Sequence, residues 1–452
     1  MTDSLESRLS PGALVTDPQV IEGYRRDQAA LVPAGMPRAV VRAAGTADVS
    51  AALAWASAHQ VPVVPRGAGT GLSGGANAID GCLILSLEKL TAIREINAAS
   101  QYAVVEAGVL NADVGRAAAD HGLFYPPDPG SFEISSIGGN LATNAGGMRC
   151  VKYGVTRDSV LGLEAVLANG SVLRTGSGAR KNVAGYDLTS LLTGSEGTLG
   201  VITAATLRLR PLPPVTPVTF VATFTALPQL GDAVAGIAAS GVGPSLLEFI
   251  DNSTINAIED YRRCDLDRDA AGLLIGQADS ASADGDIALM MSACEKAGAN
   301  LVMRSQSAAE SEMLLQARRL AATALIAAGP TIIEDVCVPP GQLTAMLRAI
   351  ERVSADAGLV IATTVHAGDG NLHPTFRLPS LAPEIVERAM AAGARICEQA
   401  VALGGTITGE HGVGALKQPW LPAQLDPVAL AAHQAIKTAL DPAGILNPGR
   451  AF

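Results

Sequence analysis

The chain has 452 residues, of which 48% are hydrophobic and 3% aromatic, and it carries a net charge of −11 with a pI of about 5.1. This length and composition predict a globular protein of two or three domains rather than a disordered chain. The acidic charge argues against nucleic acid or an anionic membrane as the main partner, and the few aromatic side chains argue against stacking platforms for bases.

The six cysteines stand singly along the chain, without a C-x-x-C pair. This spacing indicates neither an iron–sulfur cluster nor a cysteine-type zinc site, and it is typical of reduced thiols. The N-terminus lacks the apolar core of a signal peptide, and the most apolar run, 320–328, is too short to span a membrane. We therefore expect a cytoplasmic protein without a membrane span.

The first part of the chain alternates short strands with helices. Thr46 is expected to cap a helix whose apolar positions recur at helical spacing. Asn169–Gly170 is typical of a hairpin turn. The expected strands are 39–42, 61–64, 83–87, 102–106, 160–167 and 171–174, and the expected helices are 46–59 and 111–121. This order predicts an α/β or α+β protein.

A second pattern of elements follows a cluster of prolines at 211, 213, 214 and 217, which marks a domain boundary. Strands are expected at 218–224, 246–250, 273–276, 301–304, 331–338 and 360–366, and helices at 287–297, 308–328, 342–357 and 384–403. This alternation predicts a second sheet with helices packed on it.

Five glycines fall within nine residues of the segment 62–75, directly after an apolar strand. A backbone with so few side chains can approach a ligand and point several N–H groups at it, and a diphosphate suits such a loop. Arg66 at the loop entrance could add a charge-assisted donor. The spacing matches neither a P-loop nor a dinucleotide fingerprint, so a flexible surface loop stays open as the alternative.

A second unusual segment, 124–147, is too rich in proline, glycine, serine and asparagine for a regular element. Long irregular segments in compact domains are usually functional, and its small polar side chains suit a polar ligand. A structural loop that covers the sheet is the alternative. A third glycine-bearing loop, 194–202, leads into a strand.

Three of the six histidines lie in two short motifs rich in glycine: His366 and His373 bracket one turn, and His411 follows Glu410. A strand–turn–strand would bring the first two imidazoles to one side. Two imidazoles and a carboxylate are a common ligand set for zinc or another divalent ion, which leaves His411 as a base. Ordinary polar turn residues are the alternative, and Asp369 is either a ligand or the turn itself.

These motifs carry a family resemblance. The chain resembles FAD-dependent 2-hydroxyacid dehydrogenases of the vanillyl-alcohol-oxidase superfamily, which have a PCMH-type FAD-binding domain. The nearest group contains D-lactate dehydrogenase, the glycolate oxidase catalytic subunit and D-2-hydroxyglutarate dehydrogenase. The matching motifs, from about residue 35 to the end, are PRGAGTGLSGG, IGGNLATNAGG, RKNVAGYDLTSLLTGSEGTLGVIT, HAGDGNLH, GEHGVG and LNPGR.

The resemblance implies an α+β fold with a two-subdomain, PCMH-type FAD-binding domain and a C-terminal cap domain whose antiparallel sheet is covered by helices. The implied divisions are an N-terminal segment 1–34, the FAD domain 35–214, the substrate or cap domain 215–420, and a segment 421–452 that returns to the FAD domain. Some members attach FAD through a histidine near the first glycine loop. Arg66 stands at that place here, so we expect non-covalent FAD.

The resemblance also implies which residues contact FAD. The loop 66–75 would hold the diphosphate, the segments 127–147 and 194–202 would line the flavin and adenine, and Asn447 would reach the isoalloxazine. The cofactor-binding residues expected are Arg66, Gly67, Ala68, Gly69, Thr70, Gly71, Leu72, Gly74, Gly75, Pro127, Asp128, Ser131, Ser136, Ile137, Gly138, Asn140, Thr143, Asn144, Gly146, Glu196, Gly197, Gly200, Val201, Ile202 and Asn447.

In the C-terminal half, the resemblance makes His366, His373 and Glu410 the ligands of a divalent metal, zinc or alternatively manganese, and His411 the catalytic base. The mechanism expected is metal-assisted proton abstraction from the 2-hydroxyl with hydride transfer to flavin N5.

Substrate recognition is expected from Arg319 and Thr323, which share a helix face at i, i+4 and match positions that hold the substrate carboxylate in hydroxyglutarate enzymes. The neighbouring Arg318 leaves this choice open. Ile333 and Thr375 stand where those enzymes carry a lysine and an asparagine. These departures remove partners for a second carboxylate and favour a monocarboxylate.

The expected function is therefore oxidation of a D-2-hydroxyacid, D-lactate or glycolate, to the 2-keto acid. Electrons would pass to a separate acceptor: a quinone, a cytochrome or an electron-transfer flavoprotein. The alternatives are a D-2-hydroxyglutarate dehydrogenase, a non-catalytic FAD-binding subunit of a multi-subunit oxidase, and a non-redox flavoprotein transferase of the same fold. The intact HAGDGNLH and GEHG motifs argue against the non-catalytic subunit. The chain is expected to form a homodimer or to join an oxidase complex.

Overall fold

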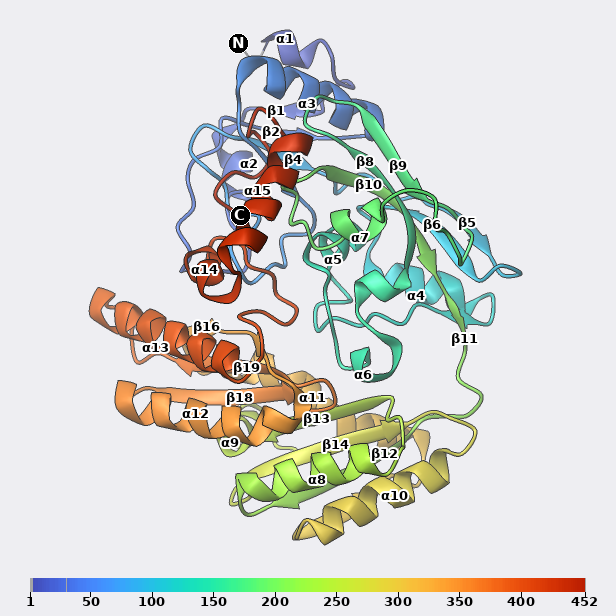
Figure 1. The fold of residues 1–452 in the computed structure, drawn as a ribbon, viewed down its shortest axis with the longest axis vertical. Coiled ribbons are helices and arrows are strands. Elements are labelled where there is room, and N and C mark those ends of the chain that lie inside the picture. Colours follow the sequence, from blue (N-terminus) through green and yellow to red (C-terminus); the bar gives the residue numbers. More distant parts are fainter. Residues whose placement is uncertain (1–2, 30, 452) are drawn as a thin grey trace. The chain divides into compact units, whose positions relative to one another are not determined.

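The computed structural model describes residues 3–29 and 31–451, and the chain forms two compact units. The first unit contains the chain up to Gly146, Gly154–Leu212, and the chain from Glu410 onward. The second unit contains Gly147–Tyr153 and Pro213–Gly409. Figure 1 shows helices and sheets in both units, which confirms the predicted α+β class.

The first sheet of the first unit has the strand order β1-β2-β4-β3, in which β4 pairs in parallel with both β2 and β3. Its elements are β1 (Leu14–Val15), β2 (Ala39–Arg42), β3 (Val63–Arg66), β4 (Leu83–Ser86) and the helix α3 (Thr46–His59). The apolar face of α3, with Leu53 and Trp55, is buried in one core with Val41, Val63 and Leu85. This core fixes the point where β3 ends and the first glycine loop begins.

The second sheet of this unit is antiparallel, with the order β5-β6-β10-β8-β9. Its strands are β5 (Ile93–Asn97), β6 (Tyr102–Glu106), β8 (Val160–Val166), β9 (Val172–Gly176) and β10 (Val201–Arg208). Further helices of the unit are α4 (Asn111–Ala119), α5 (Ile137–Thr143), α7 (Leu188–Leu192) and α15 (Pro427–Leu440). Its short elements are α1 (Asp3–Glu6), α2 (Pro18–Glu22), β7 (Leu123–Phe124), β11 (Arg210–Pro211) and α14 (Leu421–Gln424).

The second unit is built on an eight-stranded antiparallel sheet with the order β15-β12-β14-β13-β18-β19-β16, in which β17 also pairs with β19. The strands are β12 (Val218–Phe224), β13 (Leu246–Asp251), β14 (Gly272–Ala278), β15 (Leu301–Arg304), β16 (Thr331–Ile333), β17 (Val336–Cys337), β18 (Val360–His366) and β19 (Asn371–Arg377). A short helix, α6 (Cys150–Tyr153), also belongs to this unit.

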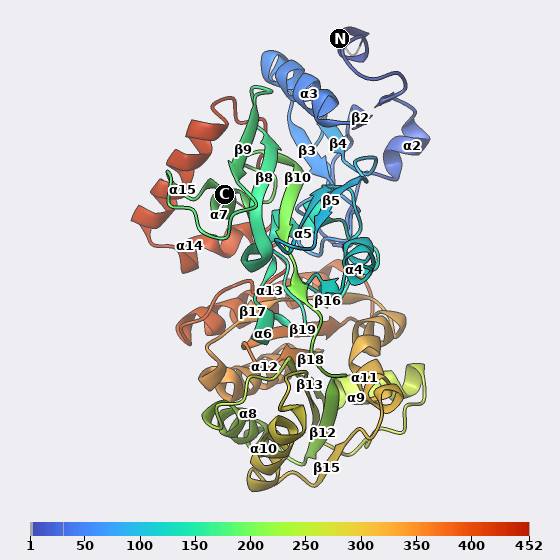
Figure 2. The same ribbon diagram turned by 90° about the vertical axis from the view of Figure 1, so that its right-hand side faces the viewer.

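Helices cover both faces of this sheet. Figures 1 and 2 show α8, α10, α12 and α13 on one face and α9 and α11 on the other. These helices are α8 (Leu227–Ala239), α9 (Asn252–Tyr261), α10 (Ala283–Lys296), α11 (Ala308–Ala327), α12 (Leu343–Ala357) and α13 (Pro383–Ala402). None of the helices in the described part of the chain combines the length and apolarity that crossing a bilayer requires.

Helix α12 illustrates why these segments fold as they do. Leu343, Met346, Leu347 and Ile350 recur at helical spacing and are buried, so one stripe of the helix faces the sheet. Gly358 ends the helix with a φ of +60°, a conformation that suits glycine, and the chain turns directly into β18.

Most predicted elements are confirmed, and the departures have local causes. Thr46 does not cap α3, because Gly45 holds the cap position and the Thr46 hydroxyl donates to Glu164 at 2.8 Å. The segment 124–147 is not wholly irregular: it contains α5, which Ser136 caps at its N-terminus. The expected strand 331–338 is split into β16 and β17.

Candidate functional site

The first glycine loop lies against the second unusual segment within the first unit. Gly69 and Gly74 have backbone φ values of +77° and +73°, which residues other than glycine rarely adopt. A Cβ atom on Gly67 would lie 2.5 Å from the Oγ of Ser136, so a side chain here would displace that hydroxyl. The chain therefore exposes backbone rather than side chains where these two loops meet.

Two asparagines expected to contact the cofactor hold the second loop in shape. Asn140 donates to the Oγ of Ser135 at 3.2 Å and accepts from the Nδ2 of Asn111 at 3.1 Å. The Oδ1 of Asn144 accepts from the backbone N–H of Arg157 at 2.8 Å. These hydrogen bonds fix the path of the backbone in this loop, as a rigid ligand-binding loop requires.

Arg66 is buried and directed at the N-terminal segment. Its Nη1 donates to the carbonyl oxygens of Tyr24, at 3.2 Å, and Arg26, at 2.7 Å. Burial lowers the pKa of the Arg66 guanidinium, and the nearby Asp27 carboxylate raises it. Arg66 thus anchors residues 24–26 beside the loop, and its contact with a diphosphate stays a prediction.

Asn447 joins the C-terminus to the same loops. Its backbone N–H donates to Val63 at 2.8 Å, and its Nδ2 donates to the carbonyl oxygens of Gly75 and Glu196, both at 2.9 Å. The buried Oδ1 of Asn447 has no hydrogen-bond partner in the described residues. An unpaired acceptor beside glycine loops fits a cofactor that carries both a diphosphate and a ring with N–H donors, as FAD does.

Glu196 holds the loop that carries the GEHG motif. Its two carboxylate oxygens accept from the backbone N–H groups of Val413 and Gly414, both at 2.7 Å. Ser73, from the first glycine loop, donates to the carbonyl oxygen of His411 at 3.1 Å. Burial raises the pKa of Glu196 to about 7, and the two amide donors lower it. His411 is thereby anchored to the loops expected to bind the cofactor.

The second unit brings His366 and His373 together on the β18–β19 hairpin. In the strand register, His366 lies opposite Asn371 and His373 lies opposite Thr364, so the two imidazoles share one face of the sheet. Both side chains are buried, and the rings meet edge to face with centroids 5.1 Å apart. The predicted strand–turn–strand is confirmed. Two buried imidazoles on one face fit a divalent cation such as zinc.

Sequence reasoning missed Glu248, which is fully buried on β13 beside this pair. Its two carboxylate oxygens lie 2.8 and 2.9 Å from the Nδ1 of His366. The Nε of Arg318 donates to the same carboxylate at 2.8 Å. One signal could have found it: a single acidic residue within the apolar run Leu246–Ile250, which is typical of a functional group in a buried strand.

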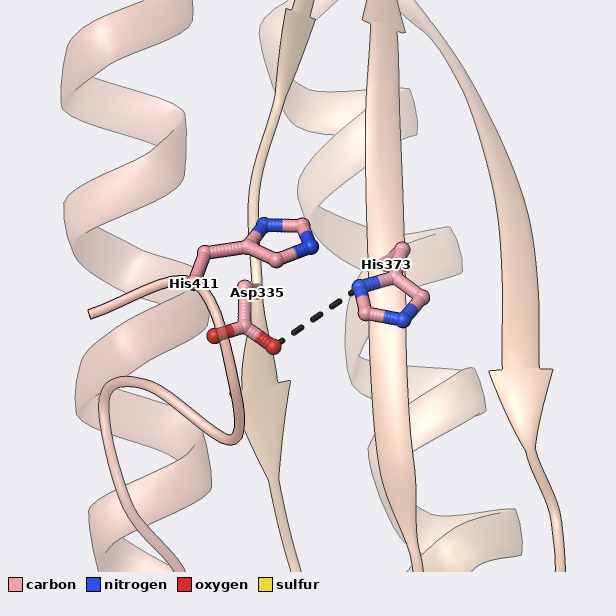
Figure 3. Close-up of side chains that lie close together, drawn as sticks. All are labelled: Asp335, His373 and His411. Carbon is pink, nitrogen blue, oxygen red and sulfur yellow. Dashed lines mark ion pairs between the residues drawn. The ribbon is translucent and has the colours of Figure 1, made fainter. Parts of the chain in front are cut away.

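His373 also has a carboxylate nearby, that of Asp335. Its Oδ1 is 3.7 Å from the Nδ1 of His373, as the dashed line in Figure 3 shows. Its Oδ2 accepts from the Oγ1 of Thr408 at 2.6 Å and from the backbone N–H of Gly409 at 2.8 Å. The chain continues from Gly409 directly to Glu410, so Asp335 fixes the residue that precedes the predicted third ligand.

The structure does not bring Arg319 to the histidines. Arg319 and Thr323 are exposed on α11, and the guanidinium of Arg319 pairs with Glu312 on the same helix. Arg318, in contrast, is half-buried and reaches Glu248. The face of α11 that packs on the sheet therefore presents Arg318 to the site instead of the residue chosen from sequence.

Two family models match the chain. The model of an FAD binding domain matches residues 37–176, and the model described as "FAD linked oxidases, C-terminal domain" matches residues 213–451.

Curated relatives match over most of their length. The chain is 44% identical over 420 residues to the glycolate oxidase subunit GlcD of Bacillus subtilis, which covers 92% of this chain and 89% of that protein. It is 36% identical over 442 residues to D-lactate dehydrogenase of Archaeoglobus fulgidus, with 95% of each chain covered. Among solved structures, p-cresol methylhydroxylase with bound substrate has a similar fold, with a TM-score of 0.79, 20% identity, and coverage of 100% of this chain and 96% of that one.

Proposed function

This chain belongs to the family of FAD-linked oxidases, and we propose that it oxidises a 2-hydroxyacid with one carboxylate to the 2-keto acid. It is an FAD-dependent oxidoreductase with a PCMH-type fold, as predicted. The names of two relatives, a glycolate oxidase subunit and a D-lactate dehydrogenase, support glycolate or D-lactate as the substrate.

The observation that carries this proposal is the buried cluster of the second unit, in which Arg318, Glu248 and His366 are linked by hydrogen bonds and His373 lies beside them. The guanidinium can pair with a substrate carboxylate, and the two neighbouring imidazoles can act as ligands of a cation. A 2-hydroxy-carboxylate needs both kinds of partner on adjacent atoms.

We assign the divalent cation, zinc or alternatively manganese, to His366, His373 and Glu410. The two imidazoles share one face of the sheet, and Glu410 follows the anchored Gly409. Nitrogen and oxygen donors of this kind suit zinc. When bound, the cation supplies a positive charge that lowers the pKa of a coordinated hydroxyl.

The residues divide the work around the substrate. Arg318, in place of the Arg319 chosen from sequence, pairs with the substrate carboxylate and orients it. An imidazole nitrogen of His411 takes the hydroxyl proton. The substrate loses this proton and a hydride from C2, and bound FAD supplies the hydride-accepting group.

Partners follow from the same chemistry. Reduced FAD must be reoxidised, and we propose a separate acceptor: a quinone, a cytochrome or an electron-transfer flavoprotein. The word "subunit" in the name of the Bacillus subtilis relative supports assembly into an oxidase complex, with a homodimer as the other arrangement. We propose that FAD is held non-covalently, because Arg66 stands where a histidine attaches FAD in some relatives, and a cytoplasmic location stays a prediction.

Two adjacent arginines provide a matched test of this assignment. Arg318→Lys should lower kcat/KM for the 2-hydroxyacid about 30-fold or more, because a lysine loses the planar, bidentate contact with a carboxylate. Arg319→Lys should stay within about twofold of the wild type, because that exposed side chain forms its ion pair with Glu312 on the helix surface. Steady-state kinetics on both variants, with FAD content measured in parallel, shows which of the two arginines binds the substrate. The reverse order of effects would restore Arg319 as the substrate residue.

A further inference from the structure

We propose that Glu248 is a positioning residue, which holds the Nδ1 hydrogen of His366 and the guanidinium of Arg318 in one fixed arrangement. The inference deepens the proposed function and rests on it, since it assigns a role toward the cation and the substrate carboxylate. No family motif pointed to this residue, which the structure alone connects to the site.

Within the described part of the chain, the carboxylate of Glu248 has two side-chain partners, His366 and Arg318, and both belong to the proposed site. Its side chain is fully buried, His366 lies 2.8 Å from one carboxylate oxygen, and Arg318 lies 2.8 Å from the other. Because β13 pairs with β18, Glu248 is directly opposite His366 in the register. Directly opposite residues of antiparallel strands share one face, so the sheet itself sets this contact.

The hydrogen-bonding roles determine the form of the imidazole. A carboxylate paired with a guanidinium offers only acceptor oxygens, and a guanidinium only donates. His366 must therefore supply the hydrogen from Nδ1, which leaves the lone pair of Nε2 available for a metal. Carboxylates that orient a ligand histidine in this way typically change metal affinity by about 10- to 100-fold when they are replaced.

Asp251, on the same strand, shows what a purely structural carboxylate looks like here. It is half-buried, and it accepts from the backbone N–H of Thr254, at the start of α9, and from that of Thr363, both at 2.8 Å. Its partners fix a helix end and a neighbouring strand. Among the described residues, the carboxylate of Glu248 accepts from no backbone N–H, and its oxygens contact two side chains that the proposed chemistry uses.

The first test compares Glu248→Gln with Asp251→Asn in otherwise unchanged full-length protein. A glutamine has one acceptor oxygen for two donors, so zinc affinity, measured by competition with a chelator, should fall about 10- to 100-fold. Asp251→Asn loses a structural acceptor on the same strand and should keep zinc affinity within about threefold. Equal zinc affinity in the wild type and Glu248→Gln would overturn the proposal.

A second measurement is made on the wild type, so it depends neither on how well Glu248→Gln folds nor on whether zinc binds. Two-bond ¹H–¹⁵N spectra of the metal-free wild type resolve the tautomers of six histidines, and the His366 signal is identified by its loss in His366→Gln. A hydrogen on Nδ1 supports the proposal, and a hydrogen on Nε2 with a bare Nδ1 overturns it. A wild type that binds no divalent cation would refute the metal assignment of the proposed function, and the tautomer would still decide the role of Glu248.

Discussion

Alanine in place of His366 or His373 should remove the divalent cation and slow turnover about a thousandfold, while FAD stays bound. Each imidazole is one of two nitrogen ligands proposed for the cation, and a cation that stabilises developing charge typically contributes several kcal/mol. The loops proposed to bind FAD lie in the first unit and the two histidines in the second, so cofactor binding should not change. Metal content per chain, the flavin absorbance spectrum and turnover are the measurements.

His59→Ala is the matched control for these variants. His59 lies in α3 of the first unit, where its Nδ1 is 2.7 Å from the carbonyl oxygen of Trp55 and its ring stacks on that side chain. This variant should keep both metal and turnover. Full metal content and activity in His366→Ala and His373→Ala would contradict the assignment of these histidines as metal ligands.

D-lactate or glycolate should reduce the bound FAD about a hundredfold faster than D-2-hydroxyglutarate does. Ile333 and Thr375 lie opposite each other in the β16–β19 pair, and Thr375 is two residues beyond His373 on the same face. Neither carries a charge, and a second carboxylate buried without a cationic partner costs several kcal/mol. Stopped-flow measurement of flavin bleaching without oxygen gives the rates.

The variant Ile333→Lys sharpens this comparison. A lysine at this position adds the missing cation, so reduction by D-2-hydroxyglutarate should accelerate while reduction by D-lactate does not. Faster reduction of the wild type by D-2-hydroxyglutarate than by either monocarboxylate would contradict the substrate assignment. It would also direct attention to Arg377, the next residue on this face of β19 after Thr375.

The hairpin that carries the histidines could be predicted because its signals are local. Strand β18 ends at His366, as the run of β-branched residues before the Gly-Asp-Gly turn indicates. The side-chain alternation of a strand then places His373 on the same face as the residues opposite it. Most of the sheet of the second unit follows from such short-range patterns.

The choice between Arg318 and Arg319 could not be made this way. Both follow the same helical pattern, and the phase of α11 depends on which of its residues pack on the sheet. Leu315, Ala321 and Leu325 are buried, and this stripe carries Arg318 toward the strands. The i, i+4 spacing shows which residues share a helix face, but it does not show which face packs against the sheet.

Glu248 could not be assigned from sequence for a different reason. Its partner His366 is 118 residues further along the chain, and no local pattern connects them. The contact arises when β13 and β18 become neighbours in the sheet. The same holds for Glu196 and the GEHG loop, where Val413 is 217 residues away. Groups that position a site are the least visible in sequence because their partners come from distant strands and loops.

We propose above all that the chain oxidises a 2-hydroxyacid with FAD and a divalent cation held by His366 and His373. The most direct test is anaerobic reduction of the bound FAD by D-lactate and by glycolate, in wild-type protein treated with a chelator and then resupplied with zinc or manganese. We predict that one of these substrates bleaches the flavin, that chelation stops the bleaching, and that the cation restores it. Bleaching at full rate in metal-free protein, or none with either substrate after metal is restored, would contradict the account.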